Sequence, residues 1–161
     1  MLGGFEHVTR VDLLGSRTFF AKLRISRPPA PPYHIADCGA GIGRITKGYL
    51  SKIHPDVVVD VIEPVKKFTD QVWEGVDWEE EGRGKVGEIV NEGLETWTPK
   101  EGKYWVIWNQ WCLGHLKDTQ LVEYLRRCKE GLVEGGVVVV KENISVGDGD
   151  EFDEVDCSVT R

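Results

Sequence analysis

The chain has 161 residues, of which 40% are hydrophobic and 29% are charged, so one domain with its own core is expected. The longest apolar run, at 137–140, is far shorter than the ~20 residues that cross a membrane, and the N-terminus shows no signal-peptide pattern. The four cysteines are scattered without a C-x-x-C pair, which argues against a structural zinc site and a disulfide framework. We expect a soluble, intracellular, monomeric protein without a bound metal.

The charge is unevenly distributed along the chain. Residues 142–161 hold seven acids and one base, and so account for −6 of the net charge of −7. The nearly neutral remainder lacks the basic face of a general nucleic-acid binder, so direct binding to nucleic acid is not expected. On charge alone, the acidic segment is either a solvated run or a site for a cationic partner.

Helical and extended patterns alternate along the chain. A helix over 11–23, with Asp12 near its start, is followed by a proline-rich connector at 28–32. Strands are predicted at 33–38, 57–62, 86–90, 104–108 and 137–140, and helices over 42–51, 64–73 and 118–132. This alternation predicts an α/β fold, with a mostly parallel sheet that has helices on both faces.

The last predicted helix and strand have the clearest boundaries. Asp118 is in a position to cap the helix, and Gly135 and Gly136 are expected to end it. The strand at 137–140 is apolar throughout, which predicts burial on both of its faces.

A glycine cluster follows the first predicted strand. It reads Asp37-Cys38-Gly39-Ala40-Gly41-Ile42-Gly43-Arg44. Glycines suit a backbone that turns sharply against a ligand, and open parallel sheets bind ligands beyond the carboxyl ends of their strands. The second strand ends at Glu63, 20 residues after Gly43, where a carboxylate can accept both hydroxyls of a ribose.

Two cofactor classes are compatible with this loop and its position. A dinucleotide fold needs G-x-G-x-x-G, but Arg44-Ile45-Thr46 follows Gly43, so the third glycine is absent. D-x-G-x-G-x-G with an acid after the second strand is instead the pattern of class I methyltransferases that bind S-adenosylmethionine. The plain alternative is a tight strand–helix turn without a ligand.

Three tryptophans, Trp105, Trp108 and Trp111, fall within seven residues at the end of the fourth strand. Trp108 is expected in the core, whereas Trp111 would face the other way and form a substrate wall. Gln110 can hydrogen-bond the amino-acid end of a cofactor. His115 can accept a proton near neutral pH, although a surface histidine beside a helix is the commoner reading.

These segments resemble the alpha-N-terminal protein methyltransferases. The likeness rests on residues 37–47, Gln110-Trp111, Gly114-His115-Leu116, 125–129, 2–7 and 153–159, and it extends over nearly the whole chain. It implies a class I fold, S-adenosylmethionine as methyl donor, and methyl transfer to the α-amino group of proteins that begin Xaa-Pro-Lys. Ribosomal and chromatin-associated proteins are implied as substrates, in the cytoplasm and also the nucleus.

The resemblance also implies a role for individual residues. The residues that match cofactor contacts are Gly39, Gly41, Arg44, Glu63, Leu94 and Gln110. Those that match substrate contacts are Leu2, Gly3, Trp111, Asp153 and Ser158. His115, Asn143 and Asp156 match residues implicated in catalysis.

The expected organisation is one methyltransferase domain over 1–161. Its parts are an N-terminal substrate-lining segment and helix at 1–27, a cofactor-binding core at 33–143, and an acidic substrate-binding segment at 144–161.

Relatives extend beyond both ends of this sequence, and their later strands complete a seven-stranded sheet. Only five strands are predicted here, so we expect a fragment or reduced form whose fifth strand is exposed at an edge. The alternatives are a weakly active or inactive peptide-binding relative, or a methyltransferase for another amine.

Overall fold

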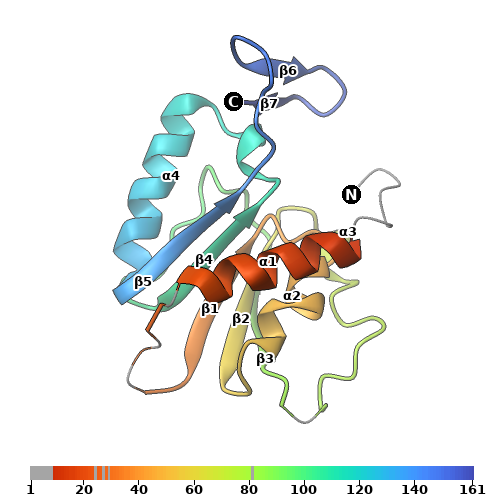
Figure 1. Cartoon of the computed structure of the whole chain (residues 1–161), viewed down its shortest axis with the longest axis vertical. Helices are drawn as coiled ribbons and strands as arrows, with labels where there is room; N and C mark the ends of the chain where they lie inside the picture. The colour runs from red at the N-terminus through yellow and green to blue at the C-terminus, as the bar shows by residue number, and fades with distance from the viewer. Residues whose placement is uncertain (1–8, 24, 27, 29, 81) are drawn as a thin grey trace.

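The computed structural model describes residues 9–161, apart from 24, 27, 29 and 81. Its centre is a five-stranded parallel sheet in the order β3-β2-β1-β4-β5 (Figure 1). The strands are β1 (Tyr33–Cys38), β2 (Val57–Ile62), β3 (Lys85–Val90), β4 (Tyr104–Gln110) and β5 (Leu132–Lys141). The predicted α/β class and the five-stranded parallel sheet are confirmed.

The remaining elements are helices and one hairpin. The α-helices are α1 (Thr9–Leu23), α2 (Arg44–Gly48), α3 (Lys66–Thr69) and α4 (Asp118–Gly131), and the 3-10 turns are η2 (Leu50–Lys52) and η3 (Leu113–His115). An antiparallel hairpin of β6 (Glu151–Asp153) and β7 (Ser158–Thr160) stands beyond the sheet, within the acidic segment. None of the described helices is long and apolar enough to cross a membrane.

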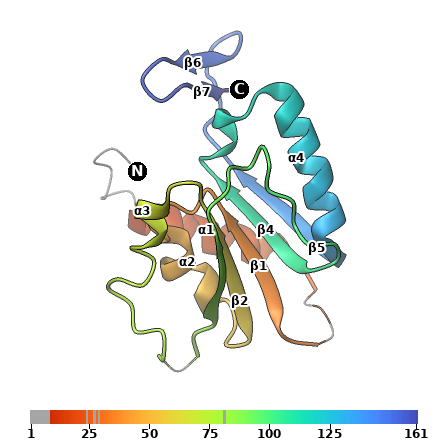
Figure 2. The same ribbon diagram turned by 180° about the vertical axis from the view of Figure 1, so that it is seen from behind.

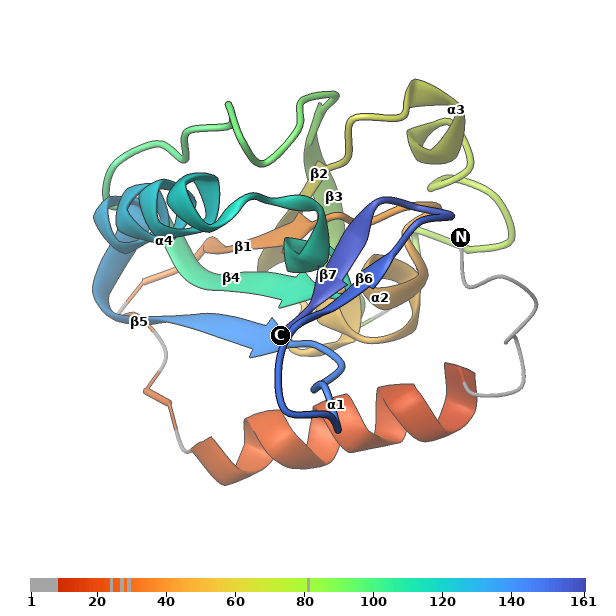
Figure 3. The same ribbon diagram turned by 90° about the horizontal axis from the view of Figure 1, so that it is seen from above.

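The sheet is the middle layer of the molecule. Helix α1 covers one face and α4 covers the other, as Figures 2 and 3 show. Every residue of β2 and β4 is buried, as expected for central strands covered on both faces. On the α1 face, the ring of Phe20 packs edge-on against that of Trp105, with centroids 5.7 Å apart. On the α4 face, Tyr124 and Cys128 are fully buried.

The longest departure from prediction is in β5, which begins at Leu132 rather than at 137. Helix α4 ends at Gly131, and the chain enters the sheet at once. Gly135, at φ 73°, lies in an irregular part of the β4–β5 ladder, where Tyr104 pairs with Leu132 but Val106 pairs with Val137. The prediction that Gly135 ends a helix was therefore wrong, as it was for Gly136; both glycines serve a bulge.

Strand β5 lies at the edge of the sheet, as predicted, but it is not buried on both faces. Among the described strands it pairs only with β4, and half of the Val140 surface is exposed. An apolar run has the same sequence pattern in a central strand and in an edge strand. Which of the two it forms depends on whether a further strand pairs with it.

Three helix predictions needed correction. The helix predicted over 42–51 begins only after Gly43, which has a left-handed backbone, and it is interrupted at Tyr49 before η2. The helix predicted over 64–73 is reduced to the single turn of α3. Asp118 does not cap α4: Lys117 occupies the cap position, and its amide donates to the side chain of Gln120.

Candidate cofactor and peptide site

The glycine loop between β1 and α2 depends on residues without a side chain. Gly39, Gly41 and Gly43 have φ values of 65°, 57° and 76°, a left-handed region that is costly for other residues. A Cβ on Gly39 would stand 2.3 Å from the Cβ of Cys112, whereas one on Gly41 would meet no atom within 4 Å. Gly39 is thus needed for packing, and Gly41 borders open space.

Glu63 connects the end of β2 to this loop. Its carboxylate oxygens accept hydrogen bonds from the amides of Gly41, at 3.0 Å, and Val65, at 2.9 Å. A nearly buried carboxylate beside the open space at Gly41 fits the hydroxyl-bearing part of an adenosyl ligand. Gly39, Gly41 and Glu63 therefore lie together at the carboxyl end of the sheet, as predicted.

A second carboxylate, Asp37, fixes the start of α2. Its Oδ2 accepts hydrogen bonds from the amide of Thr46, at 3.0 Å, and from the Thr46 hydroxyl. Burial raises the pKa of Asp37 to about 6, although the bonds from Thr46 favour the charged form. Asp37 thus joins the end of β1 to the start of α2.

Arg44 and Gln110 meet on a carboxylate of α1. Arg44 Nη1 lies 2.6 Å from Asp12 Oδ2, Gln110 Nε2 lies 2.9 Å from each Asp12 oxygen, and Lys141 forms a further ion pair. Burial by itself would raise the pKa of Asp12, but these bonds hold it below its ordinary value. We name these four residues, with Ser16, whose hydroxyl accepts from Lys141 at 2.9 Å, the Asp12 cluster.

Leu94 lies apart from the Asp12 cluster. It is buried in the apolar core below α4, in one cluster with Trp97 and Tyr104. Its carbonyl accepts a hydrogen bond of 2.8 Å from Arg127. The structure places Leu94 in the loop after β3, so its predicted role in cofactor contact stays a prediction.

Trp111 begins the peptide side of the site. Strand β4 ends at Gln110, and Trp111 has a φ of 55°, which is uncommon for a residue with a side chain. Its amide donates to the Lys141 carbonyl at 3.0 Å, and the Arg44 guanidinium lies 5.1 Å from its ring centroid. The direction of this ring therefore comes from a left-handed residue rather than from a continued strand.

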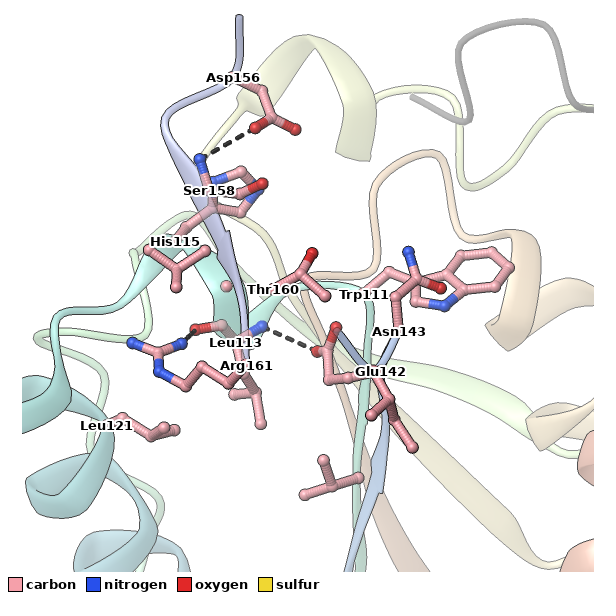
Figure 4. A pocket seen from close by; sticks show the side chains of 14 residues that line it. Trp111, Leu113, His115, Leu121, Glu142, Asn143, Asp156, Ser158, Thr160 and Arg161 are labelled. Carbon is pink, nitrogen blue, oxygen red and sulfur yellow. Dashed lines mark hydrogen bonds between the residues drawn. The ribbon is translucent and has the colours of Figure 1, made fainter. Parts of the chain in front are cut away.

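A cavity of about 380 Å³ opens beside Trp111. The cavity is also lined by His115 and Asn143, together with Asp156 and Ser158 of the hairpin. In Figure 4, His115, Ser158 and Asp156 lie on one side of the cavity, and Trp111 and Asn143 lie on the other.

One predicted substrate residue that the structure describes, Asp153, does not line this cavity. Its carboxylate accepts a hydrogen bond of 2.8 Å from the amide of Val155. Leu2 and Gly3 lie outside the described residues.

Asp156 is held as a charged group at the surface. Its carboxylate accepts a hydrogen bond of 2.9 Å from the amide of Ser158. Hydrogen bonds from the Ser158 side chain and backbone hold the pKa of Asp156 below its ordinary value, and a smaller electrostatic effect of His115 acts in the same direction. A charged carboxylate beside an imidazole suits a substrate cation.

Two residues that position this cavity were not predicted. Glu142 Oε1 accepts hydrogen bonds from the amides of Cys112 and Leu113, each at 2.9 Å, and so holds the turn that carries His115. Arg161 pairs with Asp118 at 2.8 Å and donates to the Leu116 carbonyl at 2.6 Å. The sequence signal that could have identified Glu142 is its position directly after β5, the last strand of the parallel sheet, at the ligand edge.

The hairpin approaches η3 closely because Gly114 has no side chain. A Cβ at this position would stand 2.9 Å from the Val159 carbonyl oxygen. All four cysteines are free, namely Cys38, Cys112, Cys128 and Cys157. In the described part of the chain, no group of three His, Cys, Asp or Glu is placed to hold a metal.

The parallel sheet, the glycine loop and the acid that ends β2 define a class I S-adenosylmethionine-dependent methyltransferase. A solved SAM-dependent methyltransferase from Leishmania major has the same fold, with a TM-score of 0.82 and 37% identity. The chain belongs to the family described as AdoMet dependent proline di-methyltransferase, which matches residues 1–161. The family uses S-adenosylmethionine, and the predicted resemblance is confirmed.

Named relatives agree with this family. Alpha N-terminal protein methyltransferase 1 of Schizosaccharomyces pombe is 43% identical over 163 residues, and N-terminal Xaa-Pro-Lys N-methyltransferase 1 of Mus musculus is 41% identical over 162. Each match covers all of this chain and 70% of the relative. The match to the Leishmania major protein covers 99% of this chain and 60% of that one.

Proposed function

We propose that this chain transfers methyl groups from S-adenosylmethionine to the free α-amino group of proteins that begin Xaa-Pro-Lys. The observation that carries the proposal is the cavity that brings His115, Asn143 and Asp156 together beside Trp111. Trp111 in turn contacts Arg44 at the start of α2, so the peptide cavity adjoins the glycine loop. The names of the two relatives above support the same substrate class.

The reaction requires a neutral amine. An α-amino group has a pKa of about 7.7–8.0, against about 10.4 for a lysine side chain, so it loses its proton more readily near neutral pH. When bound, S-adenosylmethionine supplies a methyl carbon activated by a sulfonium, from which the amine nitrogen displaces the sulfur. The contribution of the chain is mainly to align these groups.

Each residue of the cavity has a chemical part in this proposal. The imidazole of His115 takes the proton that the amine gives up, directly or through water. The charged carboxylate of Asp156 orients the ammonium before deprotonation, and Asn143 supplies an amide for hydrogen bonding. The Trp111 ring packs against the proline in the second position of the substrate.

The acidic segment supports recognition of the substrate lysine. Residues 142–161 account for −6 of the net charge, and the hairpin places Asp153 on an exposed strand. The long lysine side chain can reach such a carboxylate outside the cavity. Ribosomal and chromatin-associated proteins with this N-terminus are the substrates we propose, with the chain acting as a monomer.

Mass spectrometry of an Xaa-Pro-Lys peptide, after incubation with the chain and S-adenosylmethionine, tests the proposal. We expect successive methyl additions that fragmentation places on the α-nitrogen, and none on the same peptide with an acetylated α-amine. Asp156→Asn should lower kcat/KM by about 100-fold, whereas Asp148→Asn, an exposed acid outside the cavity, should not change it. Methylation of the lysine, or of the acetylated peptide, would contradict the proposal.

A further inference from the structure

The Asp12 cluster connects an N-terminal helix to the ligand edge of the sheet. Arg44 is the first residue of α2, directly after the glycine loop, and Gln110 is the last residue of β4. Both positions lie at the carboxyl ends of parallel strands, where ligands of such sheets bind. Asp12 comes from the first turn of α1 and contacts both residues, which the chain keeps far apart in sequence.

The charges of the cluster do not cancel. Two cations, Arg44 and Lys141, surround the single carboxylate of Asp12, whose side chain is only 5% exposed. The side chain of Arg44 is 18% exposed, so this excess positive charge is partly shielded from water. An excess positive charge beside a glycine loop suits a ligand with its own carboxylate.

Asp12 also determines how Gln110 is oriented. Trp108 Nε1 donates to Gln110 Oε1 at 3.2 Å, while Gln110 Nε2 donates to Asp12. The amide oxygen and nitrogen therefore cannot exchange places without loss of both interactions. One lone pair of Oε1 is left to accept from an ammonium, and the guanidinium of Arg44 has further donors for a carboxylate.

The cluster is more than a fastening for α1, because that helix has separate contacts with the body of the protein. Phe20 packs against Trp105, and Arg17 Nη2 donates to the carbonyl of Gly48 at 3.0 Å. These contacts dock the helix without any charged group at the ligand edge. The buried charges at Asp12 thus need a different explanation.

We propose that Asp12 is a positioning residue that holds Arg44 and Gln110 ready for the carboxylate and ammonium of the S-adenosylmethionine amino-acid end. Docking of α1 and binding of this end of the cofactor are then coupled. The inference rests on the proposed function only for the identity of the ligand. Because Arg44 also lies over Trp111, the same residue links the two halves of the site.

Calorimetric titration with two adenosyl thioethers tests the proposal without any turnover. S-adenosylhomocysteine has the amino-acid end, and 5′-methylthioadenosine lacks it. We expect the unaltered chain to prefer S-adenosylhomocysteine, and Asp12→Asn to reduce the ratio of the two affinities about tenfold. Arg17→Gln, which removes a contact of α1 away from the cluster, should leave the ratio unchanged.

A milder variant covers the case in which Asp12→Asn does not fold. Ser16→Ala removes only the hydroxyl that accepts from Lys141, and it should reduce the same ratio by about twofold. Each variant carries its own folding control, since 5′-methylthioadenosine reports on the rest of the cofactor site.

Four results would overturn the proposal. An unchanged ratio in Asp12→Asn would show that Asp12 only fastens the helix. A higher ratio would show that Asp12 competes with the cofactor for Arg44. An unaltered chain that binds both thioethers equally would show that the cluster does not receive the amino-acid end; only a chain that binds neither would count against the proposed function as well.

Discussion

The two halves of the ligand edge are built differently. The cofactor side, made of the glycine loop and the Asp12 cluster, rests on buried strands and is held by polar side chains from several elements. The peptide side, made of η3 and the β6–β7 hairpin, is largely exposed and is held by Glu142, Arg161 and the close approach at Gly114. The comparison shows that a site can join a buried half with many polar contacts to an exposed half with few anchors.

The largest expected effect is on the cofactor side, in Gly39→Ala. Its Cβ would combine a clash of 2.3 Å with a left-handed backbone, so the free energy of unfolding should fall by about 4 kcal/mol. Gly41→Ala has the same kind of backbone but open space, and should cost about 1–2 kcal/mol while weakening S-adenosylhomocysteine binding. Urea unfolding and calorimetry compare the pair; equal losses of stability would show that the Cys112 contact yields.

The next effect concerns pH, again on the cofactor side. The pKa of buried Asp37 is about 6 in the folded chain, against 3.8 ordinarily, so its favourable contribution is complete below pH 3.8 and is lost as pH rises through 6. The loss amounts to about 3 kcal/mol. Urea unfolding between pH 4 and 7 should show this decrease, and Asp37→Asn should flatten it. A variant with the same slope would contradict the assignment.

On the peptide side, Glu142→Ala removes the acceptor of two backbone amides at η3. The free energy of unfolding should fall by about 2 kcal/mol, and kcat/KM for the peptide should fall about tenfold because His115 loses its support. The affinity for S-adenosylhomocysteine should stay the same. Glu142→Gln keeps an acceptor and should recover most of the activity; an alanine variant with full activity would remove Glu142 from the account.

The smallest effect is at the hairpin. Ser158→Ala removes the side-chain hydrogen bond that is the main cause of the low pKa of Asp156. The pKa of the Asp156 carboxyl should then move up toward 3.8, in an NMR titration. The stabilising contribution of the charged carboxylate is present above pH 3.8 and is lost as pH falls through the folded-state pKa, so the effect is confined to acidic solution. An unmoved titration curve would show that Ser158 has no such role.

The sequence predicts the cofactor side of the ligand edge better than the peptide side. Gly39, Gly41 and Glu63 lie next to strand ends, so the order of strands and helices places them correctly. Asp12 could be expected only at the start of a helix, because its partner Gln110 lies 98 residues away and no local pattern joins them.

The peptide side was harder to foresee. The hairpin consists of two three-residue strands within an acidic run, and these strands are too short for a sequence pattern to show them. The chain also turns at Trp111, which has a left-handed backbone although it is not a glycine. Local patterns pointed to Trp111 and His115, whereas Asn143, Asp156 and Ser158 came only from the resemblance to a family. Similarly, Gly135 and Gly136 were predicted to end a helix. Their actual place in a bulge depends on pairing with the neighbouring strand, which the local sequence does not show.

We propose that the two halves of the ligand edge hold cofactor and peptide side by side. Calorimetric titration of an Xaa-Pro-Lys peptide into the chain, first alone and then saturated with S-adenosylhomocysteine, tests this arrangement. We expect one peptide per chain in both titrations, with binding that is lost when the α-amine is acetylated. Displacement of S-adenosylhomocysteine by the peptide, or equal binding of the acetylated peptide, would contradict it.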